Sequence, residues 1–222
     1  MRIRKKKHLE ERLKLVSDYV IVPDRDIPNV TEAVKNKNYF NFQEIFGNNN
    51  PVELEIGCGK GGFIVQKAKE NPNVNYIAVE LLCNIIVMAA ELAKKEKITN
   101  VKFVNSGAEY LPRFIKPNSI NKIYLNFSPP FPPLTYETRR LTCDRFVVAY
   151  KDYLVSGGKI IQKTDDKDFF NYSLGKFTQH GFETQDISFL LNSNQIENTE
   201  TEYEKKFKSI GIDICGLIAT KV

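Results

Sequence analysis

The stretch Val52-Glu-Leu-Glu-Ile-Gly-Cys-Gly-Lys-Gly-Gly62 joins a short apolar strand to a glycine-dense turn, and a helical pattern follows it. Glycines at positions 57, 59, 61 and 62 let the backbone turn tightly and approach a ligand closely, because glycine has no β-carbon. The stretch therefore predicts a nucleoside-binding strand–turn–helix unit. The alternative is an ordinary strand-to-helix connection that binds nothing.

Glu55, two positions before the first glycine, bears on the class of ligand. Gly57, Gly59 and Gly62 also satisfy the dinucleotide fingerprint Gly-x-Gly-x-x-Gly, so the glycines alone do not identify the ligand. A pyrophosphate prefers bare amides and a positive helix end. A carboxylate at this position would repel phosphate and suits S-adenosylmethionine (SAM), which is cationic and has no phosphate. We expect SAM as the cofactor and keep an NAD-dependent enzyme as the alternative.

Length and charge limit the number of domains and the classes of protein that fit this chain. With 222 residues, of which 42% are hydrophobic, the chain can bury the core of one α/β domain, which we place at residues 31–222. The net charge of +5 is concentrated in an N-terminal basic arm, residues 1–30, which contains Arg2, Arg4, Lys5, Lys6, Lys7, Arg12 and Lys14. No apolar stretch follows these residues, so we predict neither a secretory signal nor a membrane anchor. The arm is either a solvated terminus or a segment that follows nucleic-acid phosphates.

The cysteines indicate neither a metal site nor a disulfide framework. The four of them, Cys58, Cys83, Cys143 and Cys215, are widely spaced, and the chain has only two histidines. This arrangement does not match zinc-ligand spacing, and we predict that no metal is bound. Buried free thiols are typical of a reducing compartment, so we expect a cytoplasmic protein.

Strand-like and helix-like patterns alternate along the chain. We predict strands at 52–56, 74–80, 101–105, 120–127 and 158–164, helices at 61–70, 83–97, 138–155 and 166–179, and two late strands at 182–191 and 212–220. The βαβ alternation predicts a mostly parallel, Rossmann-like sheet with ligands at the carboxyl ends of its strands. The two late strands, with no long crossover between them, predict an antiparallel pair at or near the sheet edge.

Polar residues at two predicted strand ends favour an adenosine-containing cofactor. Glu80 ends the strand at 74–80, roughly twenty residues after Gly57, where a carboxylate can accept both ribose hydroxyls. The strand at 101–105 ends in Asn105, which is followed by Ser106, Gly107 and Ala108. These small and polar groups are suited to lining an adenine slot.

Five spaced motifs carry a resemblance to a known family. They are Met1-Arg-x-Arg-Lys5, the loop Asn126-Phe-Ser-Pro-Pro-Phe-Pro-Pro-Leu134 with Arg139-Arg-Leu-Thr142, Lys163-Thr-Asp165, Thr201-Glu-Tyr-Glu204, and Lys206-Phe207 before the last strand. In this order the chain resembles the bacterial tRNA (guanine-N(7)-)-methyltransferases. The resemblance covers nearly the whole chain and is far more specific than the glycine turn.

The resemblance implies a class I SAM-dependent methyltransferase that modifies ring nitrogen 7 of guanine 46 in the tRNA variable loop. It assigns catalysis to Asp165 and Glu204 and expects a monomer or homodimer. The implied cofactor-binding residues are Glu55, Gly57, Gly59, Glu80, Asn105, Gly107, Ala108 and Asn126. The implied substrate-binding residues are Arg139, Arg140, Asp165, Thr201, Glu202, Tyr203 and Glu204.

The chain departs from the family pattern at the centre of the loop. Where the family usually has Ser-Asp-Pro-Trp-Pro-Lys, Pro129, Phe131 and Pro133 replace the carboxylate, the indole and the lysine. Gly107 stands where relatives often have Asp. These losses leave open a catalytically weakened relative that binds SAM and RNA.

Several of the assigned residues also have purely structural interpretations. Thr201 and Glu204 have the spacing of a helix capping box. Arg139 and Arg140 can neutralise neighbours on a helix face. Phe131 either packs in the loop or stacks on the target base.

Overall fold

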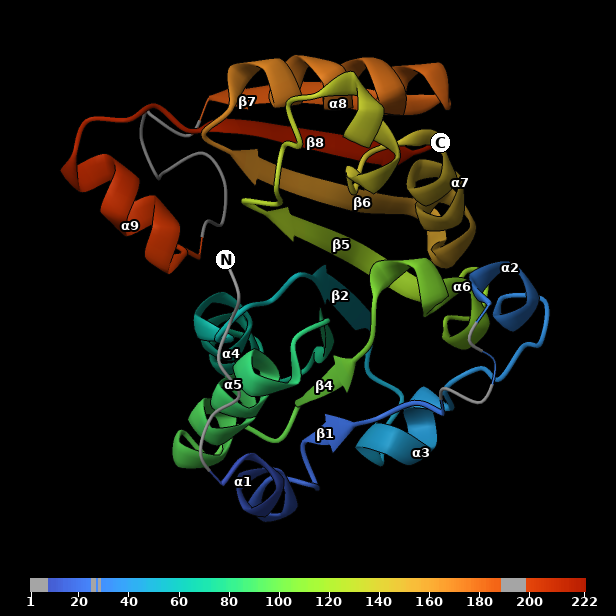
Figure 1. Cartoon of the computed structure of the whole chain (residues 1–222), viewed down its shortest axis with the longest axis vertical. Coiled ribbons are helices and arrows are strands. Elements are labelled where there is room, and N and C mark those ends of the chain that lie inside the picture. The colour runs from blue at the N-terminus through green and yellow to red at the C-terminus, as the bar shows by residue number, and fades with distance from the viewer. Residues whose placement is uncertain (1–7, 25–26, 28, 189–198) are drawn as a thin grey trace.

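The computed structural model describes residues 8–24, 27, 29–188 and 199–222. Its centre is an eight-stranded sheet in the order β1-β4-β3-β2-β5-β6-β8-β7 (Figure 1). The first six strands in this order pair in parallel, and β8 pairs antiparallel with both β6 and β7. The strands are β1 (Val20–Ile21), β2 (Val52–Ile56), β3 (Asn75–Glu80), β4 (Val101–Asn105), β5 (Ile120–Asn126), β6 (Leu154–Thr164), β7 (Phe182–Ser188) and β8 (Cys215–Lys221).

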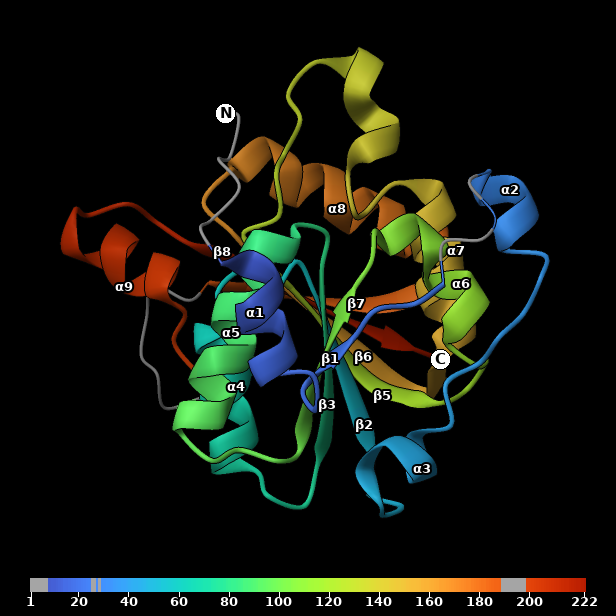
Figure 2. The same ribbon diagram turned by 60° about the horizontal axis from the view of Figure 1, so that its bottom comes forward.

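Helices cover both faces of the sheet (Figure 2). They are α1 (Leu9–Leu15), α2 (Val30–Ala33), α3 (Phe42–Phe46), α4 (Gly62–Glu70), α5 (Cys83–Lys95), α6 (Leu111–Phe114), α7 (Asp144–Tyr153), α8 (Lys167–Gln179) and α9 (Glu202–Ser209), with 3₁₀ segments at Ala108–Tyr110 and Leu134–Arg139. Because strand side chains alternate between faces, β3 sends Tyr76 and Ala78 to the core beneath α1, α4 and α5. Ile77 and Val79 enter the core beneath α6, α7 and α8.

The predicted fold class is confirmed. Strand β2 has the predicted bounds, the other predicted strands and helices overlap observed elements, and the two late strands form the antiparallel pair β7–β8. Strand β6 begins earlier than predicted, at Leu154, and helix α7 begins later, at Asp144. Residues 189–191 of one predicted strand lie outside the described residues.

The described part of the predicted basic arm belongs to the folded body. Strand β1 pairs with β4, and Tyr19 is buried in the core beneath α5. Arg12 in α1 forms an ion pair with Glu91 of α5 at 2.5 Å. Arg2, Arg4 and Lys5–Lys7 lie outside the described residues, so a solvated terminus and contact with nucleic-acid phosphates both stay open for them.

The sheet topology gathers the predicted site at one edge. Glu55, Glu80, Asn105 and Asn126 lie at or next to the carboxyl ends of β2, β3, β4 and β5. The register places Glu80 beside Asn105. Helix α9 lies beyond the carboxyl ends of β5 and β6 (Figure 1). The described helices are too short or too polar to cross a bilayer.

Candidate active site

Two adjoining cavities open at the carboxyl edge of the sheet. The first, of about 540 Å³, lies among the glycine turn, the start of α4 and the start of α9. The second, of about 690 Å³, lies among the end of β3, the segment after β4 and the proline-rich loop after β5. Gly57, Asn126 and Phe127 line both cavities. Because the cavities share these residues, a single ligand with two chemically different ends can occupy both.

Glu80, at the end of β3, forms hydrogen bonds with the glycine turn and with the residues that follow the strand. Its Oε2 accepts a hydrogen bond from the amide of Gly59 at 3.2 Å, and its Oε1 accepts one from the amide of Leu82 at 2.9 Å. The side-chain amide of Asn105 donates to the main-chain oxygens of Glu80 and Leu81, each at 3.0 Å. Glu80 lines the second cavity with one lone pair left on each oxygen, so its carboxylate can still accept two hydroxyl groups.

Three residues that line the two cavities have a buried side-chain oxygen with no hydrogen-bond partner among the described residues. The side-chain amide of Asn126 donates to Glu55 Oε1 at 2.9 Å. Glu55 Oε2, Asn126 Oδ1 and Ser128 Oγ are buried, and none has a hydrogen-bond partner among the described residues. Buried polar groups in folded proteins are nearly always paired. Unsatisfied acceptors at the cavities therefore indicate a place for a ligand group that is rich in hydrogen-bond donors.

The environment of Glu55 makes its charge sensitive to a bound cation. The side chain is buried, and desolvation raises its pKa to about 7. The hydrogen bond from Asn126 and the charge of Lys163 oppose this shift. A cation placed beside the carboxylate would favour its ionised form.

The segment after β4 contains a carboxylate that the sequence motifs did not identify. A β-carbon built on Gly107 would lie 2.5 Å from Glu109 Oε2, so the Glu109 carboxylate occupies the space that a side chain at position 107 would need. Gly107, Ala108 and Glu109 all line the second cavity. The acid missing at position 107 is therefore partly replaced by one two residues later.

The proline-rich loop is held in a strained conformation. Phe127 and Phe131 have positive φ angles of 50° and 44°, which are unfavourable for residues with a β-carbon. Arg140 is buried, and its guanidinium donates to the main-chain oxygens of Pro130 at 2.8 Å and Phe131 at 3.1 Å. It also stacks on the ring of Tyr172. Arg140 thus supports the loop from within, and its contact with the substrate stays a prediction from the resemblance.

Arg139 differs from its neighbour. It is exposed, lines the second cavity and lies over the ring of Tyr136, with 4.5 Å from its guanidinium carbon to the ring centroid. Arg145 lines the same cavity and is also exposed. These two guanidinium groups place positive charge at the mouth of the second cavity.

Helix α9 forms one wall of the first cavity. The Thr201 side chain accepts from the amide of Glu204, and the Glu204 side chain accepts from the amide of Thr201, which completes the predicted capping box. Thr201, Tyr203 and Lys206 line the cavity. The Tyr203 ring is 58% exposed and stacks on Phe127 with 5.7 Å between ring centroids.

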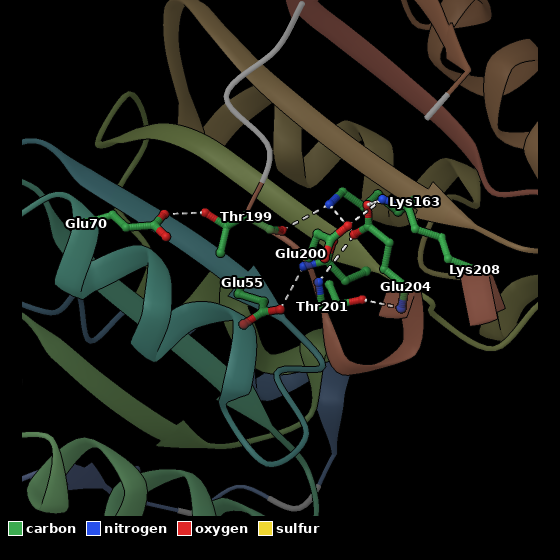
Figure 3. A network of polar contacts seen from close by, with 9 residues as sticks. Glu55, Glu70, Lys163, Thr199, Glu200, Thr201, Glu204 and Lys208 are labelled. Atoms are coloured by element: carbon green, nitrogen blue, oxygen red, sulfur yellow. Dashed lines mark hydrogen bonds and ion pairs between the residues drawn. The ribbon is translucent and has the colours of Figure 1, made fainter. Parts of the chain in front are cut away.

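The two predicted catalytic carboxylates lie in different environments. Asp165 is exposed at the end of β6, outside the residues that line the two cavities. Glu204 is fully buried and forms an ion pair with Lys163 at 2.8 Å (Figure 3). The Glu204 carboxylate therefore points into the protein in this structure, not toward a substrate on the cavity wall. The backbone of Glu202 begins α9.

The described residues provide no cluster of three metal-ligating side chains. The four cysteines are free. Cys58 lines the first cavity, and burial raises the pKa of its thiol well above the ordinary value, which keeps the thiol protonated.

Together the parallel sheet, the glycine turn and the acids at the ends of β2 and β3 define a class I methyltransferase fold. A family model described as "Putative methyltransferase" matches residues 49–217. The solved structure of the 16S rRNA methyltransferase KamB superposes with a TM-score of 0.63 at 13% identity, covering 83% of this chain and 95% of that one. At this identity the likeness shows the fold alone.

Sequence relatives narrow the class to a family. The tRNA (guanine-N(7)-)-methyltransferase of Lachnoclostridium phytofermentans is 37% identical, and the alignment covers 88% of this chain and 96% of the relative. That of Geobacillus sp. is 40% identical, with 95% and 91% covered. The chain belongs to the tRNA (guanine-N(7)-)-methyltransferase family. The family does not favour the NAD-dependent alternative.

Proposed function

We propose that this protein transfers a methyl group from SAM to ring nitrogen 7 of a guanine in tRNA, at position 46 of the variable loop, in the cytoplasm. The family supports the reaction and the substrate. The main structural support is that Glu55, Asn126 and Ser128, which line the two cavities, each have a buried side-chain oxygen without a hydrogen-bond partner.

The cofactor fits the two ends of the site. The α-ammonium group of SAM carries three donors and a positive charge, which match the acceptors on Glu55, Asn126 and Ser128. Its ribose hydroxyls match the lone pairs that remain on Glu80, and its adenine matches the segment Ser106–Glu109. A dinucleotide would place a pyrophosphate at the glycine turn, beside the carboxylates of Glu55 and Glu80. Like charges disfavour that arrangement.

The reaction places modest demands on the protein. SAM supplies an electrophilic methyl group on a sulfonium centre. Nitrogen 7 of guanine has an in-plane lone pair and no proton, so its attack requires no general base. Positioning two reactants in line can lower a barrier by about 7–11 kcal/mol in favourable cases. The chain can therefore act without the family carboxylate that Pro129 replaces.

Orientation of the guanine is the task that we assign to the residues around the cavities. Asp165 supplies an exposed carboxylate at the end of β6, which can pair with the donor edge of guanine or stabilise the cationic product ring. Thr201 and Tyr203 border the first cavity, where the exposed Tyr203 ring offers a stacking surface. Arg139 and Arg145 suit the tRNA phosphates.

The direct test is methyl transfer from isotopically labelled SAM to tRNA, followed by nucleoside mass spectrometry. We expect label in 7-methylguanosine and none when guanine 46 is replaced by adenine. Asp165→Ala should reduce transfer strongly while the dissociation constant for SAM changes little. Equal loss of both, or loss of neither, would contradict the role of Asp165.

A second function would give a different result in the same experiment. A relative inactivated by the loop Pro129–Pro133 would bind SAM and tRNA but leave no label in the RNA. A thermal shift with NAD and none with SAM would overturn the proposed cofactor, because only a ligand of the folded state raises the melting temperature by mass action.

A further inference from the structure

The most deeply buried ion pair among the described residues joins β6 to α9. Lys163 Nζ lies 2.8 Å from Glu204 Oε2, and the two side chains are 3% and 0% exposed. Every other ion pair in this part of the chain has at least one partner that is more than a quarter exposed. Desolvating two charges is costly, so a buried pair needs further contacts to persist.

Lys163 connects four parts of the site. Its Nζ also donates to the main-chain oxygen of Thr199 at 3.2 Å and lies 5.7 Å from the centroid of the Phe63 ring in α4. Its main-chain oxygen accepts from the amide of Phe127 at 2.8 Å, where the strained loop begins. One residue thus contacts the helix after the glycine turn, the loop after β5, the segment that leads into α9 and α9 itself. Figure 3 shows its contacts with Thr199 and Glu204.

Glu204 links the ion pair with Lys163 to the residues that line the first cavity. The oxygen that meets Lys163 also accepts from the amide of Thr201, at 3.3 Å. Thr201 and Tyr203 then face the first cavity, and Tyr203 and Phe207 pack on Phe127. The Thr199 hydroxyl donates to Glu70 of α4 at 2.6 Å, which holds the same segment from its other side.

We propose that Lys163 and Glu204 are positioning residues that fix Thr201 and Tyr203 on the wall of the cavity, and that Glu204 does not contact the guanine. This inference rests on the proposed methyltransferase function for its kinetic consequence. The geometry carries it: the Glu204 carboxylate is fully buried, and the cavity is lined by its neighbours on α9.

A double substitution separates positioning from substrate contact. Lys163→Met removes the closest cation of the buried Glu204 carboxylate and leaves it Lys208, at 3.7 Å, and Glu204→Gln removes the closest anion of the buried Lys163 ammonium. The double variant K163M/E204Q removes both buried charges and keeps the capping box, which accepts Gln. We expect kcat for tRNA methylation to fall by about a hundredfold in each single variant, because small misplacements are costly in catalysis. In the double variant kcat should be at least about tenfold higher than in the single variants, which is half of the loss on a logarithmic scale. The dissociation constant for SAM should stay within about threefold throughout.

Hydrogen exchange in the peptide covering residues 199–209 provides a readout that does not depend on activity. Exchange should quicken by about tenfold or more in each single variant and return toward the wild-type rate in K163M/E204Q. The matched control is the exposed pair Lys69–Glu96, at 3.1 Å, where K69M should change neither exchange in this peptide nor kcat. If K163M does not fold, E204D keeps the charge, shortens the side chain and should give intermediate exchange.

Three outcomes would overturn the inference. The first is unchanged exchange in both single variants. The second is a double variant as inactive as E204Q while α9 stays protected, which would show that Glu204 contacts the substrate. The third is loss of SAM binding in proportion to kcat, which would indicate general destabilisation. If the wild-type protein transfers no methyl group, the proposed function fails, but the exchange comparison still decides whether the pair holds α9.

Discussion

At the scale of single residues, the unusual feature is a buried carboxylate with one oxygen unpaired. Desolvation raises the pKa of Glu55 from 4.5 to about 7. Protonation is thus favoured in the folded, ligand-free protein. This group contributes stability that is present below pH 4.5 and is lost as the pH rises through about 7. A bound cation acts in the opposite direction, since it stabilises the ionised form.

SAM binding should therefore depend on pH. We expect the dissociation constant to fall by about tenfold between pH 6 and pH 8, as the pKa near 7 implies. Isothermal titration calorimetry in buffers of different ionisation enthalpy should show proton release near pH 7. Glu55→Gln should bind SAM more weakly and without this pH dependence. A dependence that persists in the variant would assign the titration to another group.

Two glycines should respond differently to alanine. At Gly61 the φ angle is +81° and a β-carbon would lie 2.7 Å from Ala89 Cβ, in the packed core under α5, so Gly61→Ala should cost about 2–4 kcal/mol and lower Tm by roughly 5–10 °C. At Gly107 the obstacle is the flexible end of Glu109. Gly107→Ala should keep Tm within about 2 °C but weaken SAM binding about fivefold by displacing that carboxylate. Calorimetry measures Tm and SAM binding in each variant, and equal falls in Tm would contradict this contrast.

At the scale of elements, the loop after β5 depends on its anchor. Two residues in it have unfavourable φ angles, and Arg140 supports it through the carbonyl groups of Pro130 and Phe131. The adjacent Arg139 is exposed at the cavity mouth. The two neighbouring arginines therefore differ in exposure, and we expect Arg140 to support the loop and Arg139 to contact RNA.

The two arginines can be told apart by salt dependence. Arg139→Ala should weaken tRNA binding and reduce the slope of log affinity against log salt by about 1, with Tm unchanged. Arg140→Ala should lower Tm and reduce kcat by about tenfold or more, since it frees a loop that borders the reaction, and should leave the salt slope as it was. A reduced slope in both variants would place both side chains on RNA.

Periodicity predicted the elements that the core requires and missed those that depend on distant contacts. Strand β2 is a continuous apolar run before a glycine turn, so its bounds were readable. Strand β1 consists of only Val20 and Ile21, which is too short for a periodic pattern, and it forms by pairing with β4. For helix α9 the sequence predicted only the capping box at its start. The helix is rich in charged residues, so its pattern does not indicate that Glu204 is buried.

At the scale of the whole molecule, the N-terminal segment has two parts. Its described part completes the sheet through β1 and packs Val16 and Tyr19 into the core. Its first residues carry positive charge, for which phosphate contact and a solvated terminus are the two alternatives.

Two truncations test this division. Removal of residues 2–7 should leave Tm within about 2 °C and flatten the salt dependence of tRNA binding. Removal of residues 2–21 should also lower the free energy of unfolding by several kcal/mol, because the variant loses β1, the Arg12–Glu91 pair and the buried Tyr19. Denaturant titrations of both variants provide the measurement. An unchanged salt slope in the first variant would assign residues 2–7 to a solvated terminus.

The site was predictable where a motif or a strand end marks it. Glu55, Glu80 and Asn126 were identified in this way and border the cavities. Ser128 and Lys163 stand in two of the motifs but were given no role, and Glu109 was not identified. Their roles depend on which atoms are buried and unpaired, on a partner in α9 and on a neighbouring glycine, respectively. The signals for Lys163 were its place in the motif Lys163-Thr-Asp165 and at the end of an apolar strand. Burial cannot be read from that pattern alone.

The most direct test of the central claim is a crystal structure of the protein with S-adenosylhomocysteine. We expect the ammonium group within hydrogen-bonding distance of Glu55, Asn126 and Ser128, and the ribose hydroxyls on Glu80. An empty cleft at saturating ligand, or a ribose far from Glu80, would contradict the claim that these acids form the cofactor site.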